Sequence, residues 1–453
     1  MKTIFISILS GLEAKSILRT NILGRLLKEE DLRVVLFVKS PERIDYYRKE
    51  FSHPRLVYES VGEYKFARAN RLFEFFKHYL IKNRTLSLYK KLVFKDSGNL
   101  FKFLGSHLVS IILANRLFRK IARFFDFWLA KDEIFSVFFE KYKPDLVFLA
   151  NLFDEAEISL LREAKKRGVK TVGFVNSWDK ITSKGFMRLL PDKLIVPNEI
   201  VKKEAEKYAD MSASKIFVSG VPQYDFYFNS DDLQSREEFF GEIKADPKKP
   251  LLVYAPMGTA FSNSDWLVID MMREITEKEL NMPAELLVRF QPNDFFDKKE
   301  EFTKRPWMRF DLPGTRFGSV RGVDWDMSRE ELKHLKNTLY HMSVLVSYAT
   351  SLSVDAACFD KPVININFEI QKGQPSLKTP TRRYDTEHYR KALASGGIRL
   401  ALNRQELVEW IRKYINNPEL NREGRKRLVE EQCFKTDGQA GRRIAECILT
   451  NLK

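Results

Sequence analysis

The sequence predicts an α/β protein with two Rossmann-like domains, each built on a parallel sheet between layers of helices. The first observation is a strand, helix, strand start, in which apolar residues 3–9 and 33–38 flank an amphipathic helix over residues 16–29. Both strands are continuous apolar runs, as in a sheet that is buried on both faces. The same alternation of strands and helices starts again at Leu251.

The second observation is a polar, charged segment between these two series. Residues 229–250 contain the runs DDLQSREE and ADPKKP, which are typical of a linker. At 453 residues the chain is long enough for two domains. We therefore expect an N-terminal domain over residues 1–228, a linker over 229–250 and a C-terminal domain over 251–453, whose last helix packs back on the first domain.

Composition restricts the class of partner. The formal net charge of +16 and the isoelectric point near 9.4 favour an anionic partner. The three cysteines have no CxxC spacing, which indicates neither a disulfide framework nor a zinc site and fits a reducing cytoplasm. The opening apolar run is only about seven residues long, so we interpret it as the first strand and not as a signal peptide. No run reaches the roughly 18 apolar residues of a membrane span.

A helical segment over about residues 64–142 interrupts the first domain. Aromatic and basic residues alternate along it, beginning with Lys65 and Phe66, and the acids between Lys65 and Arg123 are only Glu74 and Asp96. Basic amphipathic helices that are too short to span are typical of proteins on an anionic membrane surface. The alternative is helices that pack on their own domain with a solvated basic face. Nucleic acid is a rival partner, but the segment has no zinc finger, helix-turn-helix or RNA-binding aromatic pattern.

Residues 344–366 form the most informative stretch of the second domain. An apolar strand ends at a hydroxyl-rich turn, a short helix carries Asp355, and a second strand follows. Such a turn offers backbone N–H groups and the hydroxyls of Thr350 and Ser351 to a phosphate, while Asp355 can accept from ribose hydroxyls. An ordinary core turn between two strands is the alternative. The small turn at Gly258 and Thr259 also suits a diphosphate.

Polar clusters follow two predicted strands of the first domain, at residues 151–155 and 176–185. The carboxyl edge of an open parallel sheet is where such folds bind ligands. Asp154, Asp179 and, in the first turn, Glu13 are therefore the candidates for a general base, although Asp154 also suits a helix N-terminus. The turn at Ser10 and Gly11 lacks a GxGxxG pattern and is not assigned to a dinucleotide.

The stretch Ser347-Tyr348-Ala349-Thr350-Ser351, with Asp355 and Asp360-Lys361-Pro362-Val363-Ile364, resembles the nucleotide-binding signature of GT-B glycosyltransferases. It is also similar to that of their relatives, the CDP-glycerol glycerophosphotransferases and UDP-GlcNAc 2-epimerases. Asp355 stands for the commoner Glu, and Asp360 for Gly. Other segments resemble family patterns: residues 177–185, Gly220 to Asp225, Arg289 to Pro292 and residues 437–444. Gln291 stands where the CDP-glycerol group has histidine.

The resemblance implies two domains that face each other across a cleft, with the donor nucleotide on the C-terminal one. The expected donor contacts are Gly258, Thr259, Arg289, Gln291, Ser347, Thr350, Ser351 and Asp355. The expected acceptor and cleft residues are Ser10, Gly11, Asn176, Ser177, Trp178, Lys180, Gly220, Pro222, Gln223 and His388. An exposed helix histidine is the alternative for His388.

The predicted function is transfer of a sugar from a nucleotide-activated donor to a lipid-linked or polysaccharide acceptor, by a protein held peripherally at the cytoplasmic membrane face. No cofactor, no bound metal and no specific nucleic acid are expected, and no oligomeric state is predicted. An inverting reaction needs one of the candidate bases, whereas a retaining one does not. Two alternatives stay open: a polyol-phosphate transferase that uses a CDP-alcohol donor, and an inactive nucleotide-binding or membrane scaffold.

Overall fold

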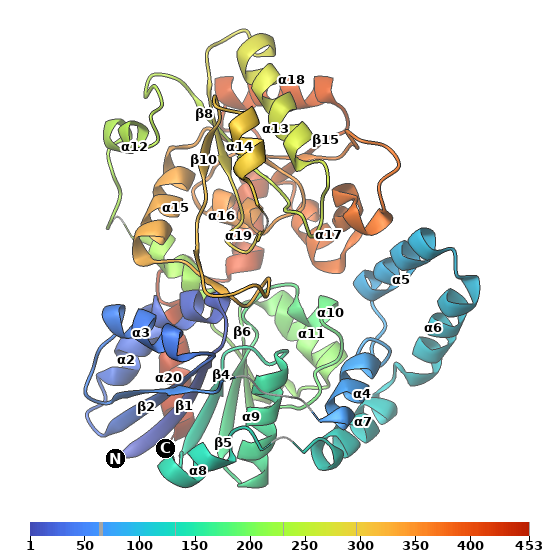
Figure 1. The fold of residues 1–453 in the computed structure, drawn as a ribbon, viewed down its shortest axis with the longest axis vertical. Coiled ribbons are helices and arrows are strands. Elements are labelled where there is room, and N and C mark those ends of the chain that lie inside the picture. Colours follow the sequence, from blue (N-terminus) through green and yellow to red (C-terminus); the bar gives the residue numbers. More distant parts are fainter. Residues whose placement is uncertain (63–66, 132, 230, 296, 453) are drawn as a thin grey trace. The chain divides into compact units, whose positions relative to one another are not determined.

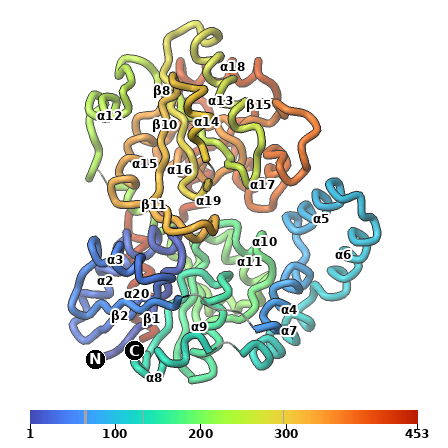
Figure 2. The backbone as a smooth tube through the Cα atoms, viewed as in Figure 1, coloured from blue at the N-terminus to red at the C-terminus, as the bar shows by residue number. Residues whose placement is uncertain are grey.

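The computed structural model describes residues 1–62, 67–131, 133–229, 231–295 and 297–452 (Figures 1 and 2). The chain forms two compact units. Unit 1 comprises Met1–Lys90, Asn99–Phe228 and Cys433–Lys453, and unit 2 comprises Lys91–Gly98 and Asn229–Gln432. Each unit contains its own parallel sheet, so the predicted class of two Rossmann-like α/β domains is confirmed.

Unit 1 contains a seven-stranded parallel sheet in the order β3-β2-β1-β4-β5-β6-β7. Its strands are β1 (Lys2–Ile8), β2 (Leu32–Val38), β3 (Leu56–Ser60), β4 (Leu146–Leu149), β5 (Lys170–Phe174), β6 (Lys193–Val196) and β7 (Ile216–Val218). The strand order reverses between β1 and β4. Loops that leave the carboxyl ends of these two strands therefore flank the position where doubly wound sheets bind ligands.

Helices cover both faces of this sheet (Figure 1). They include α1 (Gly11–Glu13), α2 (Asn21–Leu27), α3 (Pro41–Glu50), α9 (Glu155–Lys166), α10 (Lys180–Ser183), α11 (Glu199–Ala209) and α20 (Ala440–Leu452), with a π-helical turn at Ala14–Leu18. Alternate side chains of β1 enter two cores, Phe5 on one face and Ile4 and Ile6 on the other. The C-terminal helix α20 buries Ile444 and Ile448 in the second core, against α2.

The interrupting segment consists of helices, namely α4 (Arg68–Phe76), α5 (Arg84–Ser97), α6 (Leu100–Leu113), α7 (Arg116–Leu129) and α8 (Ser136–Tyr142). They belong to unit 1 except for the second half of α5, because Lys91–Gly98 belongs to unit 2. Its predicted start at Tyr64, with Lys65 and Phe66, lies outside the described residues. No single helix in the described parts of the chain is both long and apolar enough to cross a membrane. Helices α6 and α7 pass that criterion only as a pair, and they are bent by 92° at their junction.

Unit 2 contains a six-stranded parallel sheet in the order β10-β9-β8-β13-β14-β15. Its strands are β8 (Leu251–Ala255), β9 (Glu285–Arg289), β10 (Arg309–Asp311), β13 (Val344–Ser347), β14 (Val363–Ile366) and β15 (Ile398–Ala401), and β11 (Thr315–Arg316) pairs separately with β12 (Trp325–Asp326). The strand order reverses between β8 and β13. The two turns predicted to bind the donor directly follow these strands.

The helices of unit 2 are α12 (Arg236–Glu242), α13 (Asp265–Glu274), α14 (Lys299–Lys304), α15 (Arg329–His341), α16 (Leu352–Cys358), α17 (Glu387–Ala394), α18 (Arg404–Asn416) and α19 (Arg422–Cys433). Helix α12 lies inside the segment interpreted as a linker. Ser235 and Glu238 form a capping box that starts it, and Phe239 and Phe240 are fully buried. The segment therefore belongs to the folded unit, because two aromatic side chains among its polar residues anchor it.

Candidate functional site

Glu13 links the two loops at the strand reversal of unit 1. Its carboxylate accepts hydrogen bonds from the backbone N–H groups of Leu9, at 2.5 Å, and Ser10, at 2.8 Å. It also accepts one from the side-chain amide of Asn151, at 3.0 Å, in the loop after β4. Glu13 is 1% exposed, and burial, with the negative charge of Asp154, raises its pKa. The bonds to Leu9 and Ser10 hold Glu13 in the loop after β1, and the bond from Asn151 joins that loop to the one after β4.

Asp154 is the N-cap of α9 and is half-buried. One carboxylate oxygen, Oδ1, accepts from the backbone N–H groups of Ala156, at 2.9 Å, and Glu157, at 3.3 Å. Burial raises its pKa. Glu157, in the first turn of α9, is fully buried and accepts the backbone N–H of Asn151 at 2.7 Å. Burial and the charges of Glu13 and Asp154 raise the pKa of Glu157 well above its usual value.

Lys180 completes this cluster of unit 1. Its ammonium group donates to Oδ1 of Asn151 at 2.7 Å, and burial lowers its pKa. The predicted residues Glu13, Asp154 and Lys180 are therefore brought together. Asn151 and Glu157 belong to the same cluster and were absent from the predicted site. The position of Asn151, directly after a buried strand, is the signal that could have identified it.

The loop after β5 carries the other predicted residues of this edge. Asp179 accepts from the hydroxyls of Ser177, at 2.6 Å, and Ser183, at 2.9 Å, so it closes its own loop. Trp178 is half-buried. Asn176 is only 6% exposed, and neither atom of its side-chain amide has a hydrogen-bond partner among the described residues. A buried amide without a partner is costly, so Asn176 is a strong candidate for a ligand contact.

The segment Gly220 to Asp225 positions the C-terminal helix. Asp225 accepts the backbone N–H groups of Ala440, at 2.9 Å, and Gly441, at 2.7 Å, which start α20. Gly220 has a φ of +91°, and a side chain there would meet Ala440 at 3.0 Å. Pro222 is buried and Gln223 half-buried. Asp225 and Gly220 therefore serve the docking of α20. Ser10 is the N-cap of α1, which begins at Gly11.

The turn after β8 already binds carboxylates. The N–H of Gly258, whose φ is +82°, donates to Asp265 at 2.7 Å. The N–H and hydroxyl of Thr259 donate to Asp294 at 3.1 and 2.7 Å. Gln291 donates to the carbonyl oxygens of Pro256 and Met257, at 3.3 and 2.7 Å, and so supports the turn. The donors predicted to bind a diphosphate therefore hold anionic groups of the chain itself.

The predicted donor contacts in and after the turn that follows β13 differ in their exposure to solvent. Ser347 is fully buried and is bonded to the Asn365 amide at 2.9 Å. Asp355, on α16, is 6% exposed. Thr350 is half-buried and Ser351 exposed at the start of α16, so these two hydroxyls are accessible to a ligand. Ser347 belongs instead to the core, because its oxygen serves the strand-to-strand network.

Arg289 makes an ion pair inside the sheet of unit 2. It is 6% exposed and forms an ion pair with Asp311 at 2.9 Å, which joins β9 to β10. Three cationic side chains that were not among the predicted donor contacts lie near the turn after β8. Arg321 and Arg383 both lie over the ring of Phe261, at 4.9 and 4.7 Å, and the Lys378 ammonium donates to the carbonyl oxygen of Thr259. The predicted residue His388 lies on α17, 3.5 Å from the hydroxyl of Thr386.

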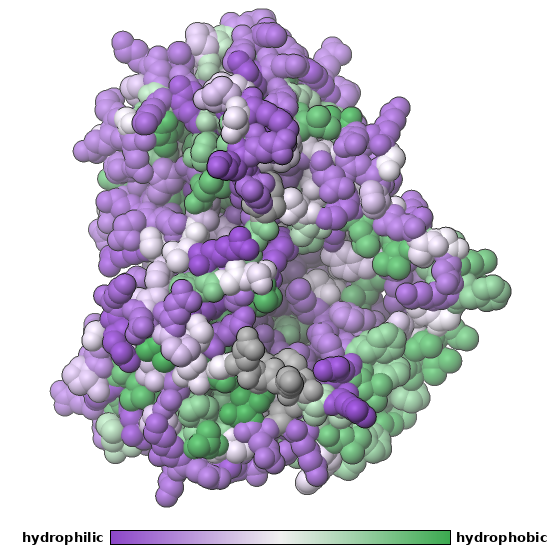
Figure 3. Space-filling model, viewed as in Figure 1, coloured by the Kyte–Doolittle hydropathy of each residue, from purple (hydrophilic) through white to green (hydrophobic). Residues whose placement is uncertain are grey.

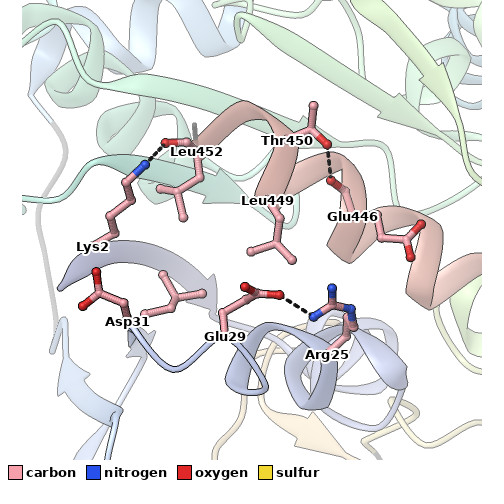
Figure 4. A pocket seen from close by; sticks show the side chains of 9 residues that line it. Lys2, Arg25, Glu29, Asp31, Glu446, Leu449, Thr450 and Leu452 are labelled. Atoms are coloured by element: carbon pink, nitrogen blue, oxygen red, sulfur yellow. Dashed lines mark hydrogen bonds and ion pairs between the residues drawn. The ribbon is translucent and has the colours of Figure 1, made fainter.

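A separate pocket of about 380 Å³ lies at the opposite, amino edge of the unit 1 sheet (Figure 4). Its wall includes the ion pair of Arg25 and Glu29, at 2.6 Å, and the bond from Lys2 to the carbonyl oxygen of Leu452, at 2.9 Å. None of the predicted site residues lines it. Among the described residues, no group of three or more His, Cys, Asp and Glu side chains is arranged to hold a metal ion.

Two parallel-sheet α/β units of this kind are the architecture of GT-B proteins, and comparison with solved structures shows the same fold. Staphylococcus aureus MnaA, solved with UDP, superposes with a TM-score of 0.54 at 12% identity, over 100% of this chain and 98% of that one. The UDP-GlcNAc 2-epimerase from Neisseria meningitidis, bound to UDP-GlcNAc, gives 0.53 at 12%, over 99% and 100%. The wall teichoic acid polymerase TagF gives 0.50 at 12%, over 100% and 88%.

These identities establish the fold and nothing finer. No protein-family model matches the sequence, and no curated protein matches it. The resemblance to GT-B proteins predicted from residues 347–364 is confirmed at the level of fold.

Asp265 makes the stability of unit 2 dependent on pH. Burial raises its pKa to about 6, above the roughly 3.9 of an unfolded Asp. The folded state therefore binds the Asp265 proton more tightly than the unfolded state does. This contribution to the free energy of unfolding is complete below about pH 4 and is lost as pH rises through 6. Its size is about 3 kcal/mol. We expect the free energy of unfolding, measured with urea, to fall between pH 4 and 7 in the wild type, and this fall to be absent in Asp265→Asn. Exposed Asp231→Asn is the control, and identical pH profiles for wild type and Asp265→Asn would contradict the assignment.

Proposed function

We propose that this protein is a metal-independent glycosyltransferase that moves a sugar from a nucleotide-activated donor to a lipid-linked or polysaccharide acceptor at the cytoplasmic face of the membrane. The observation that carries the proposal is the turn at residues 256–259, at the strand reversal of unit 2, with three cationic side chains beside it: Arg321, Lys378 and Arg383. A diphosphate suits this combination of backbone N–H donors and cations. The nucleotide sugar bound by the Neisseria epimerase supports the same class of ligand.

In the proposed donor complex, the diphosphate takes the place of Asp294 on the N–H and hydroxyl of Thr259. Arg321 is half-buried, and its Nε has no hydrogen-bond partner among the described residues. Its guanidinium therefore has a donor available for a phosphate oxygen. Thr350 and Ser351 add hydroxyls from the neighbouring turn. These groups stabilise the negative charge that develops on the leaving diphosphate.

The acceptor is assigned to the carboxyl edge of the unit 1 sheet. The Asn176 amide has no internal partner and would bind an acceptor hydroxyl. Asp154 would take the proton of the reacting hydroxyl, because one of its oxygens caps α9 while Glu13 has both engaged. The acceptor oxygen then bonds to the anomeric carbon, and the bond from that carbon to the diphosphate oxygen breaks, so the nucleoside diphosphate leaves with the electron pair.

Sugar transfer is preferred over polyol-phosphate transfer for one reason in this chain. Gln291 occupies the position at which the CDP-glycerol group has histidine, and its amide holds the carbonyl oxygens of Pro256 and Met257. A side chain that supports the turn and has no ionisable group cannot exchange a proton there. Label from a donor phosphate that appears in the product would instead identify a polyol-phosphate transferase.

The test is thermal stabilisation of the whole protein by UDP, GDP, CDP, CMP, dTDP and ADP, each with and without magnesium. A ligand that binds only the folded state raises the melting temperature by mass action. We expect one nucleoside diphosphate to give a shift that magnesium does not change. Absence of a shift with every nucleotide would overturn the proposal in favour of a scaffold.

Arg321→Ala is expected to weaken the affinity for that nucleotide by about tenfold or more, because a charge-assisted hydrogen bond contributes about 1.5–3 kcal/mol. Isothermal titration calorimetry measures the change. Arg442→Ala, which removes an exposed arginine of α20, is the matched control. Equal affinities for Arg321→Ala and wild type would remove Arg321 from the donor site.

A further inference from the structure

Helix α7 buries a charged network and leaves much of its apolar surface exposed. On its inward side Arg119 and Arg123 pair with Asp210 at 2.7 and 2.8 Å, and Asp126, which is fully buried, pairs with Arg162 at 2.7 Å and Arg188 at 2.6 Å. Phe118, Ala122 and Phe127 pack on the core beside this network. Its outward face is apolar, with Leu117, Ile121, Phe124, Phe125, Trp128 and Leu129 all between 40% and 64% exposed. A helix on the surface of a soluble domain normally buries its apolar side.

Helix α6 has the same outward character. Its exposed apolar side chains recur at helical spacing, and Phe101 is 91% exposed; the others are Leu100, Leu104, Leu108, Ile111 and Ile112. On its inward side the Lys90 ammonium, on α5, donates to the hydroxyl of Ser110, which is 4% exposed, and Leu113 packs against the core of unit 1. Figure 3 shows, on the face in view, apolar side chains gathered over α6 and α7. We call these residues of α6 and α7 the apolar face.

The polar anchors make this face a stable feature of the fold. The ion pairs of Arg119, Arg123 and Asp126 fix the rotation of α7 about its axis, so its apolar side cannot turn inward. Asn115 caps α7 through the backbone N–H groups of Leu117 and Phe118, at 3.0 and 3.2 Å, and so defines where α7 begins after the 92° bend. An apolar patch of this extent on a soluble protein marks an interaction surface.

Charge identifies the partner. Exposed bases flank the apolar face, namely Lys102, Arg116 and Lys120, and the only acid between residues 100 and 129 is the buried Asp126. An aliphatic and aromatic face with a basic rim is complementary to an anionic lipid surface, where side chains enter the acyl boundary and the bases contact headgroups. A second copy of this chain would bring the same positive rim against itself, which is unfavourable.

The lengths of α6 and α7 indicate how the two helices would bind a membrane. Each has 14 residues, which corresponds to about 21 Å of helix, against a hydrocarbon core of about 30 Å. Neither can span alone, and the bend of 92° prevents the pair from acting as one straight span. We infer that α6 and α7 lie in the plane of an anionic membrane surface, with the apolar face inserted to the depth of the headgroup boundary. This membrane binding extends the proposed function. It rests on that function only where it assumes that the acceptor is located at the membrane.

The test is sedimentation of the full-length protein with vesicles of phosphatidylcholine, with and without about one third phosphatidylglycerol, in the absence of nucleotide and acceptor. We expect binding to the anionic vesicles and about tenfold weaker binding to the neutral ones. The double variant Leu108→Glu, Phe124→Glu should lose binding by about tenfold or more, because charges replace inserted side chains. Leu402→Glu, at a site 56% exposed in unit 2, is the matched control and should bind like wild type.

Trp128 supplies a second readout, because its fluorescence should shift to the blue when vesicles are added, and Trp128→Phe should reduce that shift without abolishing sedimentation. Protein that stays in the supernatant with anionic vesicles would overturn the inference. So would a solution dimer that Phe124→Glu dissociates, or resistance to alkaline extraction, which marks a spanning segment. If the protein bound vesicles but no nucleotide raised its melting temperature, the proposed function would be contradicted and the membrane-surface inference would still hold.

Discussion

Asp126→Ala is expected to lower the free energy of unfolding of unit 1 by about 3–5 kcal/mol. The carboxylate is fully buried and holds two arginines that are each 1% exposed, Arg162 at 2.7 Å and Arg188 at 2.6 Å. Removing it leaves two guanidinium groups in the interior with less compensation for their charge. The same change frees α7 from α9, because Arg162 belongs to α9.

Denaturant unfolding followed by circular dichroism and tryptophan fluorescence measures this change. The control is Glu446→Ala, which removes an exposed ion pair with Arg442 on α20 and should cost less than about 1 kcal/mol. If Asp126→Ala proved as mild as that control, the buried network would not hold α7 in place. The apolar face would then not be fixed in its outward orientation.

Asp154→Asn is expected to reduce the rate of sugar transfer by about 10²–10⁴-fold while leaving nucleotide affinity and folding unchanged. Asparagine caps a helix about as well as aspartate, so the bonds to Ala156 and Glu157 survive and only the base is lost. A general base must be deprotonated. Since burial raises the pKa of Asp154, the acidic limb of the pH profile should lie above the range of an ordinary aspartate, and Asp154→Asn should flatten it.

The assay is release of nucleoside diphosphate from the donor that the melting screen selects, with membrane-extracted acceptor. Asp179→Asn is the matched control, because Asp179 is bonded to the hydroxyls of Ser177 and Ser183. It should lose far less activity than Asp154→Asn. A full rate in Asp154→Asn would exclude Asp154 as the base, and full rates in both variants would point to a retaining reaction.

Local pattern alone was enough to predict most of the architecture. Apolar runs such as residues 33–38 and the hydroxyl-rich turn before α16 identified two doubly wound units, because hydrophobic periodicity and turn chemistry are properties of neighbouring residues. The same patterns placed Glu13, Asp154 and Lys180 at one sheet edge. The basic, aromatic composition of α4 to α7 was also evident in the sequence.

The tertiary structure decided which polar groups pair with each other. Arg289 pairs with Asp311 on the next strand of the sheet. Arg321, Lys378 and Arg383 come to the turn after β8 from distant segments of the chain. Glu157 lies near Glu13 because β1, which precedes Glu13, pairs with β4, which precedes the helix of Glu157. The sequence by itself determined the order of the elements and the chemistry they carry. Only the fold decided that α7 turns Arg119, Arg123 and Asp126 inward and leaves an apolar face outside, because the buried partners Arg162, Arg188 and Asp210 come from other elements of unit 1.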